Sequence, residues 1–75
     1  MKVEVIQSAH NMYRLIATLE MEPSELPRVG EYISVERTKA DQKVWPGLES
    51  IGRYIKNVSR HFNEGKIDSA TIEVG

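Results

Sequence analysis

Residues 26–35 read LPRVGEYISV, and this stretch predicts a stiff turn that leads into a buried β-strand. Pro27 fixes its own φ angle and biases the residue before it towards an extended conformation. Gly30 supplies the backbone freedom for a tight bend directly before the β-prone end of the stretch. In the strand that follows, we expect Ile33 and Val35 to face the core, because alternate side chains point to the same side of a strand.

Two alternating stretches precede this turn. Val3 and Val5 alternate with charged residues, which is typical of a half-buried strand. Residues 12–22 alternate over a longer distance, and only Ile16 breaks the pattern, so we expect this strand to bend strongly or to carry a bulge. The two strands are expected to form a hairpin. The alternation assigns one face of the second strand to Tyr13, Leu15, Ala17, Leu19 and Met21.

The segment after the central strand is polar. Residues 38–43 have no consistent apolar face and are predicted to form a loop, which is closed by a turn at Pro46 and Gly47. Long loops on a compact scaffold are places where binding residues tend to lie.

Residues 48–62 are compatible with two structures. Their apolar side chains recur at spacings of three and four residues, which is the pattern of a helix face. Against a helix, Gly52 lies inside the segment and several of its residues favour a strand with one bulge. We favour the strand and leave the helix as the alternative. Residues 63–66 then form the turn of a second hairpin, and residues 70–74 form a last strand. The side chains that give the helical spacing are Leu48, Ile51, Ile55, Val58 and Phe62.

Length and composition set limits on the fold. The chain has 75 residues, of which 40% are hydrophobic, so it is expected to form a single small domain over residues 1–75 with a thin core. Without cysteine it has neither a disulfide framework nor a thiolate metal site, and the cytoplasm is the expected location. No membrane segment and no signal peptide are expected.

The charges are distributed unevenly along the chain. Residues 1–36 carry three basic side chains against six acidic ones, whereas residues 37–66 carry seven basic against three acidic. The basic middle of the chain is either solvated surface or a face for an anionic partner.

Part of this order of residues resembles a pattern in short bacterial and phage proteins. In those proteins a turn of the form P-x-V-G-[DE], met here by residues 27–31, leads into one strand. After a variable loop, a strand of the form Y-x-V-x-x-V-x-H follows, and residues 54–61 are similar to it. Residues 72–74 complete the likeness, which covers residues 26–74. The resemblance implies a small SH3-like barrel and brings no established activity. The chain departs from the pattern by two polar residues between Ile55 and Val58 and by a longer, more charged loop, which keeps the helical alternative open.

The sequence therefore predicts a mainly β fold, a small five-stranded SH3-like barrel. The alternative is an α+β fold, with an antiparallel sheet of four strands and one helix at about residues 48–63.

Residues that could carry catalysis are few. His10 and His61 are the two histidines; His10 has no acidic residue next to it, and His61 has Glu64 nearby in sequence but no nucleophile partner. The chain has no Gly-rich phosphate loop and no Gly-x-Ser-x-Gly nucleophile elbow. Glu20 and Glu22 share one predicted strand face but lie in no oxygen-ligand loop of the kind that binds calcium. We therefore predict no enzymatic activity, no cofactor and no metal.

The leading hypothesis is a non-catalytic binding domain. Its partner is expected to be a protein or a second copy that pairs with a sheet edge, in an assembly component or host-factor inhibitor of phage or mobile-element origin. The alternative is a small barrel that binds RNA or single-stranded DNA through the basic segment 37–66, where cations lie beside aromatic rings. The candidate partner-binding residues are Arg37, Lys39, Lys43, Trp45, Arg53, Tyr54, Lys56 and Arg60.

Overall fold

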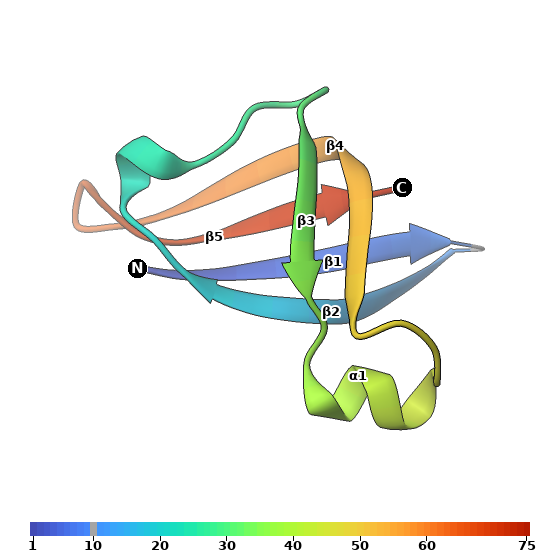
Figure 1. Ribbon diagram of the computed structural model, residues 1–75. Helices are drawn as coiled ribbons and strands as arrows, with labels where there is room; N and C mark the ends of the chain where they lie inside the picture. Colours follow the sequence, from blue (N-terminus) through green and yellow to red (C-terminus); the bar gives the residue numbers. More distant parts are fainter. Residues whose placement is uncertain (10) are drawn as a thin grey trace.

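Five strands form one curled sheet in the computed structural model, which describes residues 1–9 and 11–75. The strands follow the order β2-β1-β5-β4-β3, and the neighbours are antiparallel except for the parallel pair of β1 and β5. The sheet curls into half a barrel (Figure 1), so the mainly β prediction is confirmed. The strands are β1 (Lys2–Ala9), β2 (Met12–Glu20), β3 (Tyr32–Glu36), β4 (Ser50–Asn63) and β5 (Lys66–Val74).

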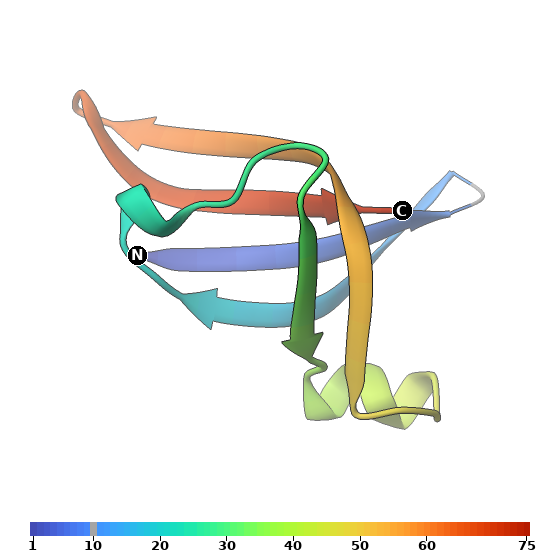
Figure 2. The same cartoon turned by 45° about the horizontal axis from the view of Figure 1, so that its top comes forward.

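The bend in β4 shapes the half-barrel. The first part of this strand pairs with β3 and the second part with β5. In both views, β3 and the first part of β4 run side by side across the direction of β1, β2 and β5 (Figures 1 and 2). The register shifts between Ile55 and Asn57, so Lys56 is an extra residue that changes which side chains face inwards. Ile51, Ile55 and Val58 therefore all pack on the core although their spacing is helical. The predicted strand is confirmed, and the alternative helix at about residues 48–63 is wrong.

A second bulge lies in β2. Val5 pairs with Ala17 whereas the next residue of β1, Ile6, pairs with Leu15. Ile16, the residue that broke the sequence alternation, is thus the extra residue, and its side chain is buried. The predicted hairpin and bulge are confirmed, but the face is not continuous across the bulge. Tyr13 and Leu15 were expected on the face of Ala17, yet both are exposed because the bulge reverses the alternation.

The core is built from small aliphatic side chains. None of the buried core residues in the described part of the chain is aromatic, and the largest fully buried side chain is Ile16. The alternating side chains of β1 and β5 supply most of the core, as predicted for the last strand. The core residues are Val3, Val5, Ile16, Ala17, Val35, Ile55, Ala70, Ile72 and Val74.

A short helix, α1 (Lys39–Val44), stands where the sequence predicted a loop. Thr38 caps its first turn, because the Thr38 side chain accepts a hydrogen bond from the Asp41 amide at 3.1 Å. The helix lacks an apolar face and is held by polar contacts, so hydrophobic periodicity gave no sign of it. A single 3₁₀ turn, η1 (Pro23–Glu25), follows β2.

The turn within residues 26–35 has the predicted form, but the strand that it enters is not a buried one: β3 lies at the edge of the sheet, and Val35 is its buried residue. Gly30 has a φ of +93°, and its amide donates a hydrogen bond of 2.8 Å to the Ile55 carbonyl. The Ile55 amide in turn donates to the Glu31 carbonyl at 2.8 Å, which starts the pairing of β3 with β4. The turn of the second hairpin is also confirmed, with positive φ at Glu64 and Gly65. Within the described residues, no helix is long and apolar enough to cross a membrane.

Candidate functional site

All five aromatic side chains of the chain lie on the surface. Their exposed fractions run from 54% for Trp45 to 69% for Tyr54. Aromatic residues bury the largest apolar areas and usually dominate the core of a domain. Here the core is made of Val, Ile and Ala instead, so the rings are displayed around the outside. Two pairs can be distinguished: Tyr13 and Trp45 line the same pocket, and the rings of Tyr32 and Tyr54 contact each other, while Phe62 belongs to neither pair.

The first pair lines a pocket. Met12, Tyr13, Arg14 and Trp45 line a pocket of about 370 Å³ between the start of β2 and the end of α1. Met12 and Tyr13 are 69% and 68% exposed, so large apolar surfaces surround the opening. Gln7 and Ala9 complete the lining, which contains no carboxylate among the described residues.

The pocket is positioned by an ion-pair network beneath it. Arg14 clamps the Asp41 carboxylate, with Nε to Oδ1 at 2.7 Å and Nη2 to Oδ2 at 3.1 Å. Arg37 Nε donates to the second oxygen, Oδ2, at 2.7 Å. The Arg14 guanidinium also lies 5.3 Å from the centre of the Trp45 ring, in a cation–π contact. One carboxylate therefore fixes the arginine on which Trp45 rests.

Arg37 also ties α1 to the loop that follows it. Its Nη1 donates to the Leu48 carbonyl at 2.8 Å, and its Nη2 donates to the carbonyls of Asp41, at 3.1 Å, and of Trp45. The Trp45 amide donates to the Asp41 carbonyl at 2.8 Å. These bonds hold the backbone of Trp45 at the end of the helix, so the ring is presented from a fixed base.

Burial and the two arginines act on Asp41 in opposite directions. The side chain is only 2% exposed, which by itself would raise the pKa of its carboxyl group. Hydrogen bonds from Arg14 and Arg37, together with their charges, outweigh burial and hold the pKa of Asp41 below its ordinary value. The carboxylate is therefore charged at neutral pH, and the network of two arginines and one aspartate carries one positive charge beside the pocket.

The second pair of rings lies on the outer face where β3 pairs with β4. Tyr32 and Tyr54 are directly opposite each other in the ladder, and their rings meet edge to face with centres 5.2 Å apart. Both are more than half exposed. Tyr32 also lies over Gly52, because a Cβ atom at that position would be 1.9 Å from the Tyr32 hydroxyl.

The eight candidate residues from the sequence do not form one face. Arg37 is 8% exposed and engaged in the network, so its expected role in contacting a partner is a misassignment. Arg53 pairs with Ile33 and Tyr54 with Tyr32, which places these neighbours on opposite faces of the sheet. Exposed positions are held by Lys39 and Lys43 on α1, by Trp45 after it, and by Arg53, Tyr54, Lys56 and Arg60 on β4.

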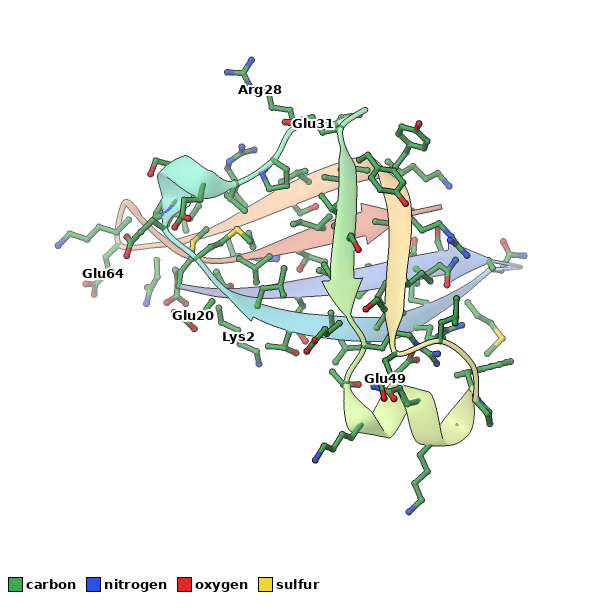
Figure 3. The ribbon with its side chains drawn as sticks, in the orientation of Figure 1. Lys2, Glu20, Arg28, Glu31, Glu49 and Glu64 are labelled. Atoms are coloured by element: carbon green, nitrogen blue, oxygen red, sulfur yellow. The ribbon has the colours of Figure 1, made fainter. Side chains whose placement is uncertain are left out.

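One of the candidate basic residues, Lys56, lies close to an acidic side chain. Lys56 lies 3.8 Å from Glu73, and Glu73 accepts a hydrogen bond from Ser8 at 2.8 Å. Figure 3 shows Arg28 and Glu31 in the loop before β3, far from Glu49 at the α1 end. The charge of Lys56 is therefore compensated by an acidic neighbour on β5.

The histidines and acids do not gather into a metal site within the described residues. His61 is exposed, and its Nε2 lies 3.4 Å from the Thr71 hydroxyl. His10 lies outside the described residues.

The residues of the pocket other than Trp45 were missed from the sequence. The sequence alternation placed Met12, Tyr13 and Arg14 in the second strand, with Tyr13 on the face of Ala17, and indicated no role in binding for any of them. The signal that could have found them is Ile16, since a bulge there turns the residues before it to the opposite face. For α1, the signal is the Thr38-x-x-Asp41 spacing, which is that of a helix N-terminus.

No protein-family model, no curated protein and no solved structure gives a significant match to this chain.

Proposed function

We propose that this chain is a non-catalytic binding domain whose partner is a protein, and that the pocket at Met12, Tyr13, Arg14 and Trp45 takes an anchor residue of that partner. The observation that carries the proposal is the outward placement of all five aromatic side chains over an aliphatic core. Trp, Tyr, Met and Arg are enriched in protein interfaces, and Trp, Tyr and Arg are also enriched in their hot spots. All four types meet at this pocket.

The chemistry of the pocket favours a particular anchor. Its walls are apolar at Met12, Tyr13 and Trp45, which suits an aliphatic or aromatic side chain. Arg14 donates to Asp41 through Nε and Nη2, and its Nη1 donates none of the hydrogen bonds found among the described residues. A carboxylate or carbonyl group next to the anchor could use that nitrogen. We therefore propose a partner segment with an apolar residue beside an acidic one.

Selection from a random peptide library displayed on phage tests this proposal. The immobilised protein should enrich peptides in which an apolar residue is adjacent to Asp or Glu. Met12→Ser should lose those peptides, since an apolar wall of the pocket becomes polar. Phe62→Ser is the matched control, because Phe62 is also exposed but lies on β4, outside the pocket lining. Equal enrichment by wild type and Met12→Ser would contradict the proposal.

We also propose an SH3-like arrangement for the half-barrel, a cytoplasmic location, and a role as an assembly component or host-factor inhibitor of phage or mobile-element origin. The resemblance described above and the lack of cysteine support these assignments. The genes that neighbour this one would separate an assembly component from an inhibitor.

A second candidate function is binding of single-stranded nucleic acid at Tyr32 and Tyr54. These exposed rings offer stacking surfaces, and Lys56 lies two residues after Tyr54 on β4. Fluorescence polarisation with a labelled oligonucleotide should show an affinity that falls steeply with salt and is reduced in Tyr54→Ala. If no binding of the oligonucleotide were detected at low salt, this candidate function would be ruled out.

A further inference from the structure

We infer that two copies of this chain pair through the free edge of β3, as antiparallel strands related by a two-fold axis at Ser34. This inference is independent of the proposed pocket, because it rests on the backbone of β3 and on the register that its own residues allow.

The free edge follows from the hydrogen bonds at both ends of β3. The Ile55 amide donates to the Glu31 carbonyl, and the Arg37 amide donates to the Glu49 carbonyl, each at 2.8 Å. Residues 31 and 37 therefore direct backbone groups towards β4, and so do Ile33 and Val35 between them, because backbone groups alternate along a strand. The amides and carbonyls of Tyr32, Ser34 and Glu36 then point away from β4. In the described part of the chain, β3 pairs with β4 alone.

The edge of β2 is covered at its bulge, whereas none of the loop hydrogen bonds found among the described residues comes from the outer edge of β3 between Tyr32 and Glu36. On β2, Ile16 forms a bulge, and its carbonyl accepts a hydrogen bond of 2.9 Å from the Thr38 amide at the start of α1. Bulges, prolines, lysines and covering segments are the devices that keep sheet edges from pairing. β3 reads YISVE, without proline or lysine, and its pairing with β4 shows no register shift.

The residues of β3 select one register. With Ser34 opposite Ser34 of the second copy, Tyr32 lies opposite Glu36 and Ile33 lies opposite Val35. In this register the three residues whose backbone groups point away from β4 all exchange hydrogen bonds with the second copy, about six in total. These residues are Tyr32, Ser34 and Glu36. Any other antiparallel register leaves at least one of the three without a partner on the opposing β3. A two-fold axis at Glu36 would in addition oppose two carboxylates.

The side chains agree with this register. The small Ser34 side chains meet at the axis, so they leave room for the strands to approach. The Tyr32 side chain leans towards β4, with its hydroxyl group over Gly52, so it leaves the free edge of β3 open to the second copy. On the inner face, the half-buried Ile33 would gain an apolar neighbour, which extends a thin core. Only one five-residue strand from each copy is involved, so the dimer is expected to be weak and concentration-dependent.

A single cysteine tests both the contact and the register. The chain has no cysteine, so Ser34→Cys introduces one thiol at the proposed axis. Opposed residues of an antiparallel pair have Cα atoms about 5.5 Å apart, within the range of a disulfide. Under mild oxidation at high protein concentration, Ser34→Cys should form a disulfide-linked dimer much faster than Thr18→Cys, an exposed position on the edge strand β2. Equal rates for the two variants would overturn the inference.

Sedimentation equilibrium of the cysteine-free chain provides the second measurement. Wild type should show a reversible dimer that Ser34→Lys weakens by about tenfold or more, because two ammonium groups would be opposed at the axis. Ser34→Pro should do the same, since it removes an amide that faces away from β4 and leaves the β3–β4 ladder intact. Thr18→Lys is the matched control and should leave the dimer unchanged. A wild type that stays monomeric at millimolar concentration, or a dimer that persists in both Ser34 variants, would overturn the inference.

Discussion

Asp41 connects more of the molecule than any neighbouring residue of α1. Its carboxylate accepts hydrogen bonds from Arg14 on β2 and from Arg37 after β3. One side chain therefore connects the two edge strands of the open sheet. A buried ion pair contributes little net stability when compared with well-packed apolar residues, but removal of one partner leaves an uncompensated charge. The network is therefore expected to be sensitive to single substitutions.

Asp41→Asn is the substitution that tests this. It leaves two guanidinium groups facing a neutral amide, and we expect the free energy of unfolding to fall by about 3 kcal/mol. Urea denaturation measures the change. Glu49→Gln is the control, because Glu49 is exposed and its side chain makes none of the ion pairs found among the described residues. A loss of the same size in the control would mean that general charge, not the network, is responsible.

The same residue predicts a dependence of stability on pH. The arginines hold the pKa of Asp41 below the ordinary value of 3.8 despite its burial. Between the folded and unfolded pKa values, the unfolded chain binds more protons, so the free energy of unfolding rises with pH there. The contribution is complete above the unfolded pKa and is lost as the pH falls through the folded one. Urea titrations between pH 5 and pH 2 should show a weaker pH dependence in Asp41→Asn than in wild type.

The elements that could be predicted from the sequence are the strands whose apolar side chains alternate regularly. Alternation located β1 and β5, and its break at Ile16 marked the bulge in β2. The 3-and-4 spacing in β4 was ambiguous because one extra residue, Lys56, produces the same spacing in a strand as a helix does. The helix α1 was not predicted because its buried residue, Asp41, is polar and is held by ion pairs with Arg14 on β2 and with Arg37 before the helix, and hydrophobic periodicity does not detect such contacts.

The tip of the second hairpin carries a residue that does not suit its backbone. Glu64 has a φ of 54° and Gly65 a φ of 78°, and such two-residue turns favour Asn before Gly. Glu64→Asn should therefore raise the free energy of unfolding by about 1 kcal/mol, since Asn enters the left-handed region at lower cost than Glu. Glu64→Gln removes the charge without this preference and should change stability little. Thermal unfolding of the three proteins separates the two effects.

Because Tyr32 packs on Gly52, the effect of Gly52→Ala on the free energy of unfolding should change sign when the Tyr32 ring is removed. In wild type, Gly52→Ala forces the Tyr32 ring away and should be destabilising, because the new Cβ atom would meet the Tyr32 hydroxyl. In a Tyr32→Ala background the same substitution should stabilise the protein by about 0.5–1 kcal/mol, since alanine loses less entropy than glycine in a strand. Chemical denaturation of wild type, the two single variants and the double variant measures these changes. If Gly52→Ala changed the stability in the same direction in both backgrounds, the Tyr32 ring would not be packed on Gly52.

At the scale of the whole molecule, the aliphatic core and the exposed rings belong together. A domain with a core of Val, Ile and Ala has little apolar area to bury on its own. Its largest apolar side chains remain outside, where a partner or a second copy can cover them. The mainly β fold and the exposure of Trp45 and Tyr54 could be anticipated from the sequence, but the exposure of Tyr13 could not, because the bulge at Ile16 reverses the alternation that assigned Tyr13 to the core face.

Hydrogen exchange followed residue by residue can show whether β3 meets a second copy. In dilute solution the amides of Ile33 and Val35 should be protected by β4, while those of Tyr32, Ser34 and Glu36 exchange rapidly. At high concentration the latter three should slow, and the alternation along the strand should disappear. Amides of β1 and β5, in the middle of the sheet, should be slow at both concentrations. In Ser34→Lys the alternation should persist at high concentration. A uniform slowing over the whole chain would instead indicate a general gain in stability, and the edge of β3 would not be the interface.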